Sequence, residues 1–439
     1  MKKLIYFLFL FGMLFNGCAV QKKPPLNVHI ENDLKSAIFS KCQTGFSLYD
    51  LNTQKVVYEK DADKFFIPAS NTKLLTYYAG LCALGDSVST IKYIINQDSL
   101  IVWPQADPSF LHPDFPNQPA FDFLKNCNKN IYLINGSYVG EKFGMGWAWD
   151  DYNDYYATQI TDLPIYGNMI SVSLNNGKLK IHPDLPAMFL CDTILTPNQI
   201  YTQRNPYNNN LSLPFMPAVN YSQRIPLNLD GKTTLVLLSD TILATGLITK
   251  EVKPLAYRKS PEFAKSIATA PADTLYKHML QRSDNFLAEQ LLLNMAYKNN
   301  VKTTQSAVIN FIQYNYLRDL PDTLRWVDGS GLSRMNLNTP RNLTAILKSI
   351  YAKAGEKRAF EALSAGGVNG TLINQFKGDE VYVYAKTGSL SNNYCLSGFL
   401  IGNSGKRYAF SMMNNNFMLP LSNIRQEVER FITSLKNQL

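Results

Sequence analysis

The sequence predicts an α/β fold that is interrupted by a large strand-rich insertion. Segments that alternate as strands do lie towards both ends of the chain, and segments with helical spacing of apolar residues lie between them. Between residues 86 and 259 the pattern changes to short apolar runs interleaved with Pro, Asn, Asp and aromatic residues. We therefore expect one sheet built from both ends of the chain, with a separate module spliced into it.

The elements before the insertion follow from periodicity and turn residues. Helical spacing covers residues 27–39, and residues 45–50 and 55–60 alternate as the two strands of a hairpin do. Residues 70–84 have the pattern of an apolar helix, which Gly85 ends. These elements predict that residues 28–85 form the first part of a discontinuous main domain.

Residues 86–259 form the predicted inserted module, and residues 260–439 the second part of the main domain. Within the insertion we expect strands at residues 131–133, 170–174 and 233–238. After it, we expect helices at residues 272–282, 286–298, 304–316, 341–352 and 421–439. Strands are expected at residues 381–385, 394–401 and 407–413.

Length and composition favour a folded protein over other classes. The chain has 439 residues, of which 46% are hydrophobic and 18% charged, and this argues against intrinsic disorder. No fixed-period repeat is visible. The formal net charge is +9, but Lys and Arg are dispersed and form no run typical of a nucleic-acid-binding arm. We therefore expect no nucleic-acid partner.

The N-terminus is typical of a targeting segment. Lys2 and Lys3 precede an apolar run over residues 4–15, which is too short to span a bilayer. Cys18 follows a glycine, which is similar to the lipobox of bacterial lipoproteins, where the cysteine is lipidated. We expect a signal peptide at residues 1–17, a tether at 18–27 and a lipid anchor on Cys18, which would hold the protein to a membrane on the periplasmic side of the cell envelope. A secretory signal with an incidental cysteine, or an uncleaved anchor, is the alternative.

The remaining cysteines and the histidines do not suggest a disulfide scaffold or a metal site. The five further cysteines are odd in number and widely spaced, although one bridge among them is feasible: Cys42, Cys82, Cys127, Cys191 and Cys395. None of the four histidines lies at metal-ligand spacing from another His or Cys.

Ser70 and Lys73 have the spacing of a nucleophile and its base. Three residues apart on a helix is one face, so the Lys73 amine can reach the Ser70 hydroxyl. A lysine that loses its charge through burial can accept the hydroxyl proton. Ser89 and Lys92 share this spacing, so the pair alone is a weak signal. A capping serine with a surface lysine is the alternative.

Two further motifs follow in order. Ser-Asp-Asn at residues 283–285 lies at a break between two apolar helices, where a polar loop can point into a cleft. Lys-Thr-Gly at residues 386–388 ends a strand, where glycine permits close approach of a ligand, and it occurs only once. Ser-x-x-Lys, Ser-Asp-Asn and Lys-Thr-Gly in this order are the signature of penicillin-binding proteins and class A β-lactamases.

Longer segments of the sequence indicate which of the families that share these three motifs the chain resembles. The chain resembles the D-alanyl-D-alanine carboxypeptidases/endopeptidases of the class C low-molecular-mass penicillin-binding proteins, the PBP4-like S13 peptidase family, from about residue 45 onwards. The resemblance rests on IPASNTKLLTYYAGLCALG (67–85), GWAWDDYNDYY (146–156), MLQRSDNFLAEQLLL (279–293), DGSGLSRMNLNTPRNL (328–343), GGVNGTL (366–372) and AKTGSLSNNYCLSGFL (385–400). The long gap between the first two motifs is also similar to this family.

The resemblance implies a fold and a reaction. The main domain would be a penicillin-binding-protein/β-lactamase-like transpeptidase domain, an antiparallel sheet flanked by helices. Ser70 would attack a D-Ala-D-Ala bond of peptidoglycan stem peptides and form an acyl-enzyme, with Lys73 as base. Ser283 would relay a proton to the leaving amine, beside Lys386. Asn285 would hold the acyl side of the substrate. β-Lactams would acylate the same serine, and no metal or organic cofactor is needed.

Other residues would bind the substrate. The resemblance places Thr387, together with the Lys386 charge, at the terminal carboxylate, with Gly388 and Ser389 beside it. It also implies that the backbone N–H groups of Ser70 and Ser389 form the oxyanion hole. Arg334 and Asp151 would contact the rest of the stem peptide. For Asp151, the neighbouring Asp150 and Asp154 compete, and a solvated acidic loop is an equal alternative.

Two other classes would fit part of these observations. A serine β-lactamase or esterase would use the same three motifs, and a non-catalytic wall-binding lipoprotein could keep the same fold. The length, the insertion and the complete set of motifs favour the peptidase. Asp284 is expected to cap the following helix and to take no part in the chemistry.

Overall fold

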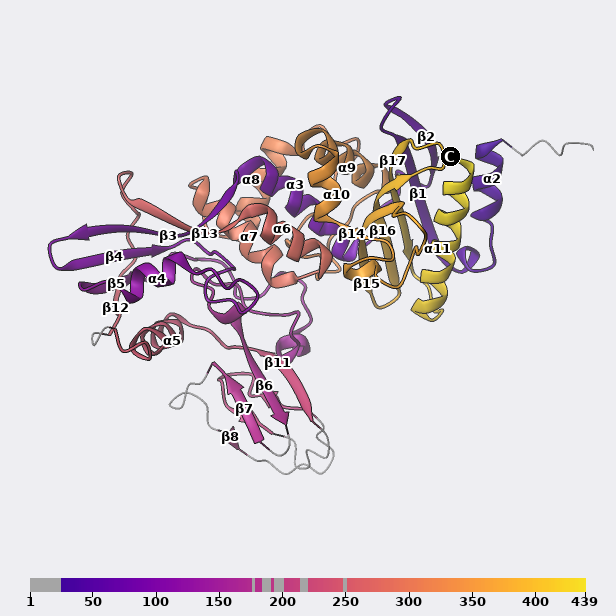
Figure 1. The fold of residues 1–439 in the computed structure, drawn as a ribbon. Helices are drawn as coiled ribbons and strands as arrows, with labels where there is room; N and C mark the ends of the chain where they lie inside the picture. The colour runs from indigo at the N-terminus through magenta and orange to yellow at the C-terminus, as the bar shows by residue number, and fades with distance from the viewer. Residues whose placement is uncertain (1–24, 176–177, 184–190, 193–200, 214–219, 248–250) are drawn as a thin grey trace, which may run out of the picture.

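Both parts of the predicted main domain contribute to one antiparallel sheet (Figure 1). The structure is a computed structural model that describes residues 25–175, 178–183, 191–192, 201–213, 220–247 and 251–439. The six strands lie in the order β14-β15-β16-β17-β1-β2, so the early hairpin pairs with the late strand β17. Their bounds are Gln43–Asp50 (β1), Lys55–Lys60 (β2), Ser364–Ala365 (β14), Val383–Leu390 (β15), Asn393–Ile401 (β16) and Arg407–Asn415 (β17). The predicted fold class is confirmed.

Helices cover both faces of this sheet. On one face lie α11 (Leu421–Gln438) and α2 (Leu26–Asp33), and Phe46 of β1 packs edge-on against Phe431 with ring centroids 5.0 Å apart. On the other face α9 (Pro340–Ala354) packs against β17 and β1. Further helices extend this second layer: α3 (Lys73–Ala83), α6 (Ala272–Gln281), α7 (Asn285–Lys298), α8 (Gln305–Tyr316) and α10 (Glu356–Ala362). Their buried apolar faces form the largest core cluster of the described residues.

The region between α3 and α6 contains three further sheets. The largest has the order β12-β5-β4-β3-β13, with β12 Lys253–Leu255, β5 Asn130–Ile134, β4 Ser99–Pro104, β3 Ser87–Asn96 and β13 Lys265–Pro271. A second has the order β11-β6-β7, with β11 Tyr221–Pro226, β6 Met169–Asn175 and β7 Lys178–His182. The third joins β8 (Cys191–Asp192), β10 (Leu211–Ser212) and β9 (Gln203–Arg204). Because β13 pairs with β3, this largest sheet extends past residue 259.

The structure corrects two predicted elements. Residues 233–238 are not a strand, because they lie within the helix α5 (Gly231–Leu243). The Thr-Val-Leu run suggested a strand, but the Asp230 side chain caps the helix by accepting a hydrogen bond from Thr233 N at 2.6 Å. The predicted helix over residues 27–39 ends early, at Asp33. The sequence analysis also missed α4 (Pro119–Lys125) and α10.

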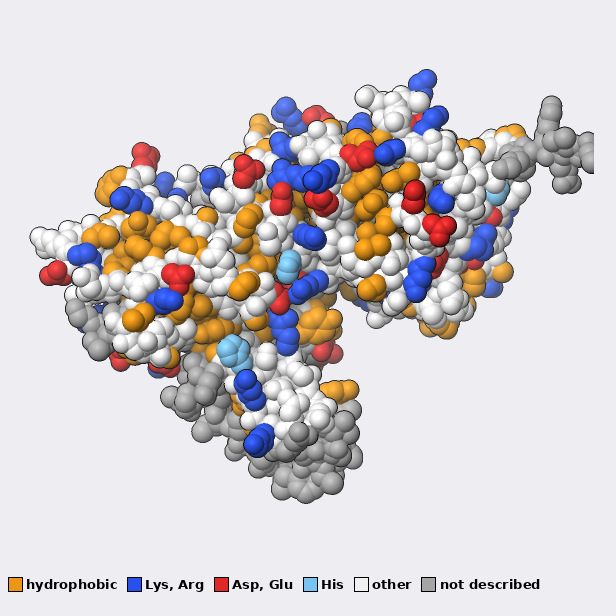
Figure 2. Space-filling view, viewed as in Figure 1, with side chains coloured by type: hydrophobic (Ala, Val, Ile, Leu, Met, Phe, Trp, Pro, Cys, Tyr) orange, Lys and Arg blue, Asp and Glu red, His pale blue; other side chains and the backbone are white. Residues whose placement is uncertain are grey.

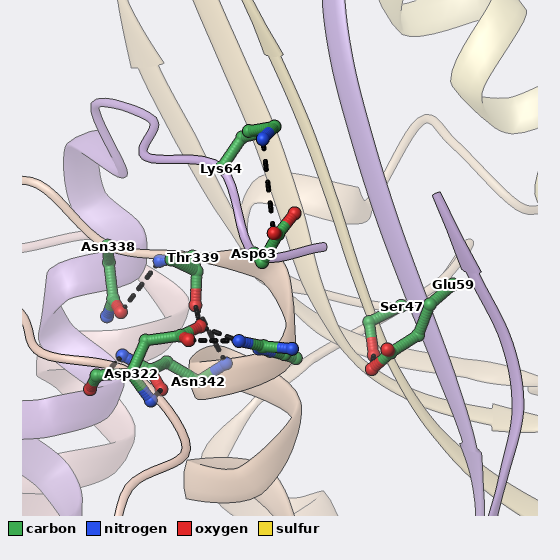
Figure 3. Close-up of polar contacts among 9 residues, drawn as sticks. Ser47, Glu59, Asp63, Lys64, Asp322, Asn338, Thr339 and Asn342 are labelled. Atoms are coloured by element: carbon green, nitrogen blue, oxygen red, sulfur yellow. Dashed lines mark hydrogen bonds and ion pairs between the residues drawn. The ribbon is translucent and has the colours of Figure 1, made fainter. Parts of the chain in front are cut away.

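A polar cluster anchors the chain just ahead of the first motif (Figure 3). Asp322 accepts a hydrogen bond from Thr339 Oγ1 at 2.7 Å, and Thr339 N donates to Asn338 Oδ1 at 2.9 Å. Asn338 also forms an antiparallel bridge with Phe66, with N···O distances of 2.9 and 3.0 Å. The segment that leads into the first motif is therefore fixed to the start of α9.

The surface charges and the cysteines can be compared with the predictions on nucleic-acid binding and on disulfides. Blue and red side chains are intermixed on the face in Figure 2, with no continuous basic patch there. No helix within the described ranges is long and apolar enough to cross a membrane. The predicted signal peptide and Cys18 lie outside the described residues.

Free thiols are found at Cys42, Cys82, Cys127 and Cys395, and the side chain of Cys191 is outside the described part.

Candidate active site

Ser70 lies in a short 3₁₀ turn that leads into α3. The turn spans Ala69–Thr72 and α3 begins at Lys73, so Ser70 precedes the α-helix and does not belong to its first turn. Ala69 has a positive φ of 48°, a conformation that side chains rarely adopt. A Cβ on Gly331 would lie 1.9 Å from the Ala69 carbonyl oxygen, and Gly331 itself has a φ of +80°. Only glycine fits there, and it lets the loop that contains it press against the turn.

Lys73 is fully buried and points at Ser70. Its Nζ donates hydrogen bonds to Ser70 Oγ at 3.1 Å, to Asn285 Oδ1 at 2.6 Å and to the Ser330 carbonyl at 2.7 Å. Burial lowers the pKa of Lys73 to about 8, although nearby carboxylates, Asp284 first, act in the opposite direction. About a tenth of the lysine is therefore neutral at pH 7. A neutral amine at this distance can accept the Ser70 proton.

Ser283 and Lys386 form a second hydroxyl–amine pair. Ser283 has a positive φ of 59° at the junction of α6 and α7, and its Oγ accepts a hydrogen bond from Lys386 Nζ at 2.9 Å. Lys386 also donates to the Thr387 carbonyl at 2.7 Å. Burial, followed by the nearby Lys73 charge, holds the pKa of Lys386 well below its ordinary value. The structure thus brings together two lysines whose charges destabilise each other.

Asn285 links the first motif to the insertion. Its Oδ1 accepts from Lys73, and its Nδ2 donates to the Tyr156 carbonyl at 3.0 Å. One Nδ2 hydrogen is left for a further acceptor. Asp284 accepts from Leu287 N at 2.9 Å, so it caps α7 as predicted.

The third motif lies on β15, against the Ser70 turn. A Cβ on Gly388 would lie 2.6 Å from the Pro68 carbonyl oxygen and 2.8 Å from Asn71 Nδ2. Glycine is therefore needed here for packing against the turn, and the predicted close approach of a ligand stays a prediction. Thr387 Oγ1 donates to Thr371 Oγ1 at 2.8 Å.

A cavity of about 830 Å³ unites these elements. Among the residues predicted for the site, those that line it are Ser70, Ser283, Asn285, Thr387, Ser389, Arg334 and Asp151. Lys73 and Lys386 lie behind this surface, fully buried. The similarly spaced Ser89 and Lys92 lie on β3, where Ser89 Oγ contacts Ser266 Oγ at 2.6 Å.

Arg334 of the main domain and Asp151 of the insertion both line the cavity. Both guanidinium ends of Arg334 donate to the Ser391 carbonyl, at 3.1 and 3.2 Å. Asp151 accepts from Tyr156 Oη at 3.0 Å. Burial first, and then the nearby acidic side chains, raise the pKa of Asp151. Asp151 lines the cavity, whereas its sequence competitors, Asp150 and Asp154, do not.

The sequence analysis missed a buried carboxylate pair beneath Lys73. Glu289 accepts from Gly329 N at 3.0 Å and Ser330 N at 2.8 Å, and thereby fixes the carbonyl that Lys73 contacts. Burial, then the Asp328 charge, raise the pKa of Glu289 to about 7. Asp328 accepts from Ser333 N at 2.7 Å within the same loop. Glu289 is one helical turn after residue 285, a spacing that could have revealed it.

Charged residues from other elements also escaped prediction. Arg282 Nη1 pairs with Asp114 Oδ2 at 2.6 Å at the border of the cavity. Arg224 of the insertion and Arg425 of α11 line the same cavity. No motif marks Arg224 or Arg425, because they arrive through tertiary packing, whereas Arg282 directly precedes Ser-Asp-Asn.

Comparisons with known proteins support this description. A model of the D-Ala-D-Ala carboxypeptidase 3 (S13) family matches residues 26–204 and 237–435. A curated protein of Haemophilus influenzae, "D-alanyl-D-alanine carboxypeptidase DacB", is 23% identical over 94% of each chain. "D-alanyl-D-alanine carboxypeptidase" of Actinomadura sp. (strain R39) is 22% identical over 90% of this chain and 82% of its own.

Solved structures share the fold. The crystal structure of penicillin binding protein 4 from Haemophilus influenzae has a TM-score of 0.73 at 21% identity, over 93% of this chain and 98% of that chain. A predatory peptidoglycan endopeptidase from Bdellovibrio bacteriovorus has a TM-score of 0.53 at 13% identity, over 90% of this chain and 92% of its own. The whole arrangement of sheet, helices and insertion is thus a known one.

Proposed function

The chain belongs to the D-Ala-D-Ala carboxypeptidase 3 (S13) family, and we propose that it hydrolyses D-Ala-D-Ala bonds of peptidoglycan stem peptides through an acyl-enzyme on Ser70. The observation that carries the proposal is the buried amine of Lys73, 3.1 Å from Ser70 Oγ at the edge of an open cavity. The names of the two curated relatives support the same activity for this chain.

Acylation begins with the neutral form of Lys73. Its amine takes the Ser70 proton while Ser70 Oγ forms a bond to the carbonyl carbon of the penultimate D-Ala. The carbonyl oxygen becomes an oxyanion, and backbone N–H groups of Ser70 and Ser389 stabilise it by a few kcal/mol. The low pKa of Lys73 supports this role at neutral pH.

Collapse of the intermediate breaks the C–N bond and releases the terminal D-Ala. The leaving nitrogen takes a proton from the Ser283 hydroxyl, which Lys386 orients, and the proton that Lys73 took from Ser70 is passed on to Ser283, so that Lys73 is neutral again. Repulsion between the two amines works against both being charged at once, and the Lys73 charge lowers the pKa of Lys386. Water then attacks the ester carbonyl while the neutral Lys73 takes its proton, and Lys73 returns that proton to Ser70 Oγ as the C–O bond to Ser70 breaks.

The substrate fits between the second and third motifs. The free hydrogen of Asn285 Nδ2 donates to the acyl-side amide, and the Thr387 hydroxyl turns from Thr371 to donate to the terminal carboxylate. Asp151 and Arg334 contact the stem-peptide side chain further along the cavity. Gly388 serves by packing β15 against the Ser70 turn. A β-lactam acylates the same serine and is released slowly.

The location of the enzyme rests on the N-terminal sequence. A signal peptide at residues 1–17 directs export, and a lipid on Cys18 anchors the mature chain to a membrane facing the periplasm, through the tether at residues 18–27. Mass analysis of the N-terminal peptide from membranes tests this. An acylated Cys18 is expected, and an unmodified N-terminus at another residue would contradict it.

The first test of the activity is intact mass after incubation with benzylpenicillin. A persistent increase by one drug molecule is expected in the wild type and not in Ser70→Ala, together with release of D-Ala from a peptide ending in D-Ala-D-Ala. Rapid loss of the drug without an adduct would identify a β-lactamase. Neither an adduct nor turnover would leave a non-catalytic wall-binding protein.

A further inference from the structure

A guanidinium from the last helix faces the cavity beside the third motif. Arg425 of α11 lines the same cavity as Ser70, and its Nη2 lies 3.5 Å from Ser389 Oγ. The guanidinium carbon lies 5.6 Å from the ring centroid of Tyr394, the residue that pairs with Ser389 between β15 and β16. The aromatic ring therefore supports the planar cation at the edge of the cavity.

Arg425 differs from two other arginines of the cavity in its partners. Arg282 is paired with Asp114 at 2.6 Å, and Arg334 donates to the Ser391 carbonyl. Within the described residues, no carboxylate lies within ion-pair distance of Arg425. An exposed guanidinium without a counter-charge is suited to bind a carboxylate in bidentate fashion.

The neighbours of Arg425 form a wall of hydrogen-bond donors that faces the same cavity. Thr387 and Ser389 come from β15, and Thr371 and Gln375 come from the segment after β14. Thr387 Oγ1 donates to Thr371 Oγ1 at 2.8 Å, and Gln375 Nε2 donates to the Arg425 carbonyl at 3.5 Å. Hydroxyl groups and a guanidinium side by side match the acceptors of a carboxylate.

We propose that Arg425 is a specificity residue that binds the free carboxylate on the leaving side of the scissile bond. The inference rests on the proposed function, which puts that carboxylate beside Thr387. Lys386 cannot serve by direct contact, because its ammonium is buried and donates to Ser283 and to a backbone carbonyl. Arg425 therefore makes the enzyme prefer substrates whose last residue ends in a carboxylate.

Two peptides that differ only at the C-terminus test this. One ends in D-Ala-D-Ala with a free carboxylate, and the other ends in the carboxamide. In Arg425→Ala, kcat/KM for the acid is expected to fall about ten-fold, while kcat/KM for the amide changes less than two-fold. The loss for the acid is limited to this size because Arg425 is exposed and solvent screens its charge. Arg425→Lys is expected to keep part of the preference. Arg318→Ala removes an exposed charge outside the cavity and is expected to change neither value.

An equal loss with both peptides, or no loss with either, would overturn the inference. Binding of the two peptides to Ser70→Ala protein, with and without Arg425→Ala, separates it from the proposed function. Binding that requires both the carboxylate and Arg425, without turnover in the wild type, would overturn the proposed activity alone. Binding of acid and amide with equal affinity would overturn the role of Arg425.

Discussion

Lys73 is the residue whose protonation controls the proposed reaction. Its amine contacts Ser70, Asn285 and the Ser330 carbonyl, so all three of its hydrogens have acceptors while it is charged. Burial opposes that charge and lowers the pKa to about 8. The charged form therefore organises the site, and in the proposed reaction the neutral form performs the proton transfer.

The rate of acylation should accordingly depend on pH. The neutral fraction of Lys73 grows as pH rises through about 8, so the second-order rate constant for benzylpenicillin should rise about ten-fold per pH unit below 8 and level off above it. Intact-mass kinetics between pH 6 and 9.5 measures this. Lys73→Arg should lose at least 100-fold, because a guanidinium stays protonated. A flat profile, or an active arginine variant, would refute the role of Lys73 as base.

Four elements meet at the cavity, and three contribute from an end, turn or loop; Lys-Thr-Gly lies inside β15 and does not end the strand as predicted, because β15 continues to Leu390. Ser70 lies in the turn before α3, Ser283 at the junction of α6 and α7, and Lys386 in β15. The fourth is the loop at residues 328–336. Asp328 of the loop accepts a hydrogen bond from Gly331 N, and Glu289 of α7 accepts one from Gly329 N. Gly331 of this loop touches the Ser70 turn most closely.

Gly331→Ala should displace the nucleophile. The new Cβ would overlap the Ala69 carbonyl, so the turn must move, and acylation should fall more than ten-fold with a clear drop in Tm. Gly405→Ala is the matched control: its φ is +77°, close to that of Gly331, but a Cβ there meets nothing within 4 Å. Gly405→Ala should lose about 1 kcal/mol of stability and no acylation. Equal behaviour of the two variants would show that the contact with Ala69 is unimportant.

Across the whole molecule, the insertion completes the site. The Tyr156 carbonyl holds Asn285, and Trp147 Nε1 donates to Asp328 at 2.9 Å. The Arg282–Asp114 ion pair makes a third link between the insertion and the helical layer. The insertion is therefore expected to influence catalysis as well as access to the cavity.

Trp147→Phe tests that influence. It keeps the aromatic bulk and removes one donor to Asp328, so acylation by benzylpenicillin should slow by up to about ten-fold with a small change in Tm. Trp103 lies on β4, in the five-stranded sheet of the insertion, and donates a comparable hydrogen bond to the Arg258 carbonyl. Trp103→Phe removes this hydrogen bond and should leave acylation unchanged. If both variants acylate at the wild-type rate, the link from Trp147 to the site has no catalytic role.

The sequence predicts residues that belong to local motifs, and it does not predict residues that reach the site only through contacts between distant parts of the chain. Ser70, Lys73 and Ser283 belong to short motifs, whose local spacing is visible along the chain, and the structure brings these residues together. Arg425 has no such motif, because only the packing of α11 beside β15 and β16 takes it there. At residues 233–238 local β propensity was outweighed by the Asp230 cap and by burial at helical spacing. The packing of Gly388 against Pro68 could not be predicted, because Pro68 is distant in sequence.

The pairing of β1 with β17 has a consequence for vectorial synthesis. Residues 43–50 emerge from the ribosome long before residues 407–415, so β1 lacks its second neighbour until almost the whole chain has been made. Lys386 and the strands that flank it are also late. The proposed nucleophile, Ser70, and its proposed base, Lys73, thus exist in the growing polypeptide without the groups that would make them reactive. A nascent chain paused before β15 should be inert towards penicillin, and the reactive serine is assembled only as translation finishes.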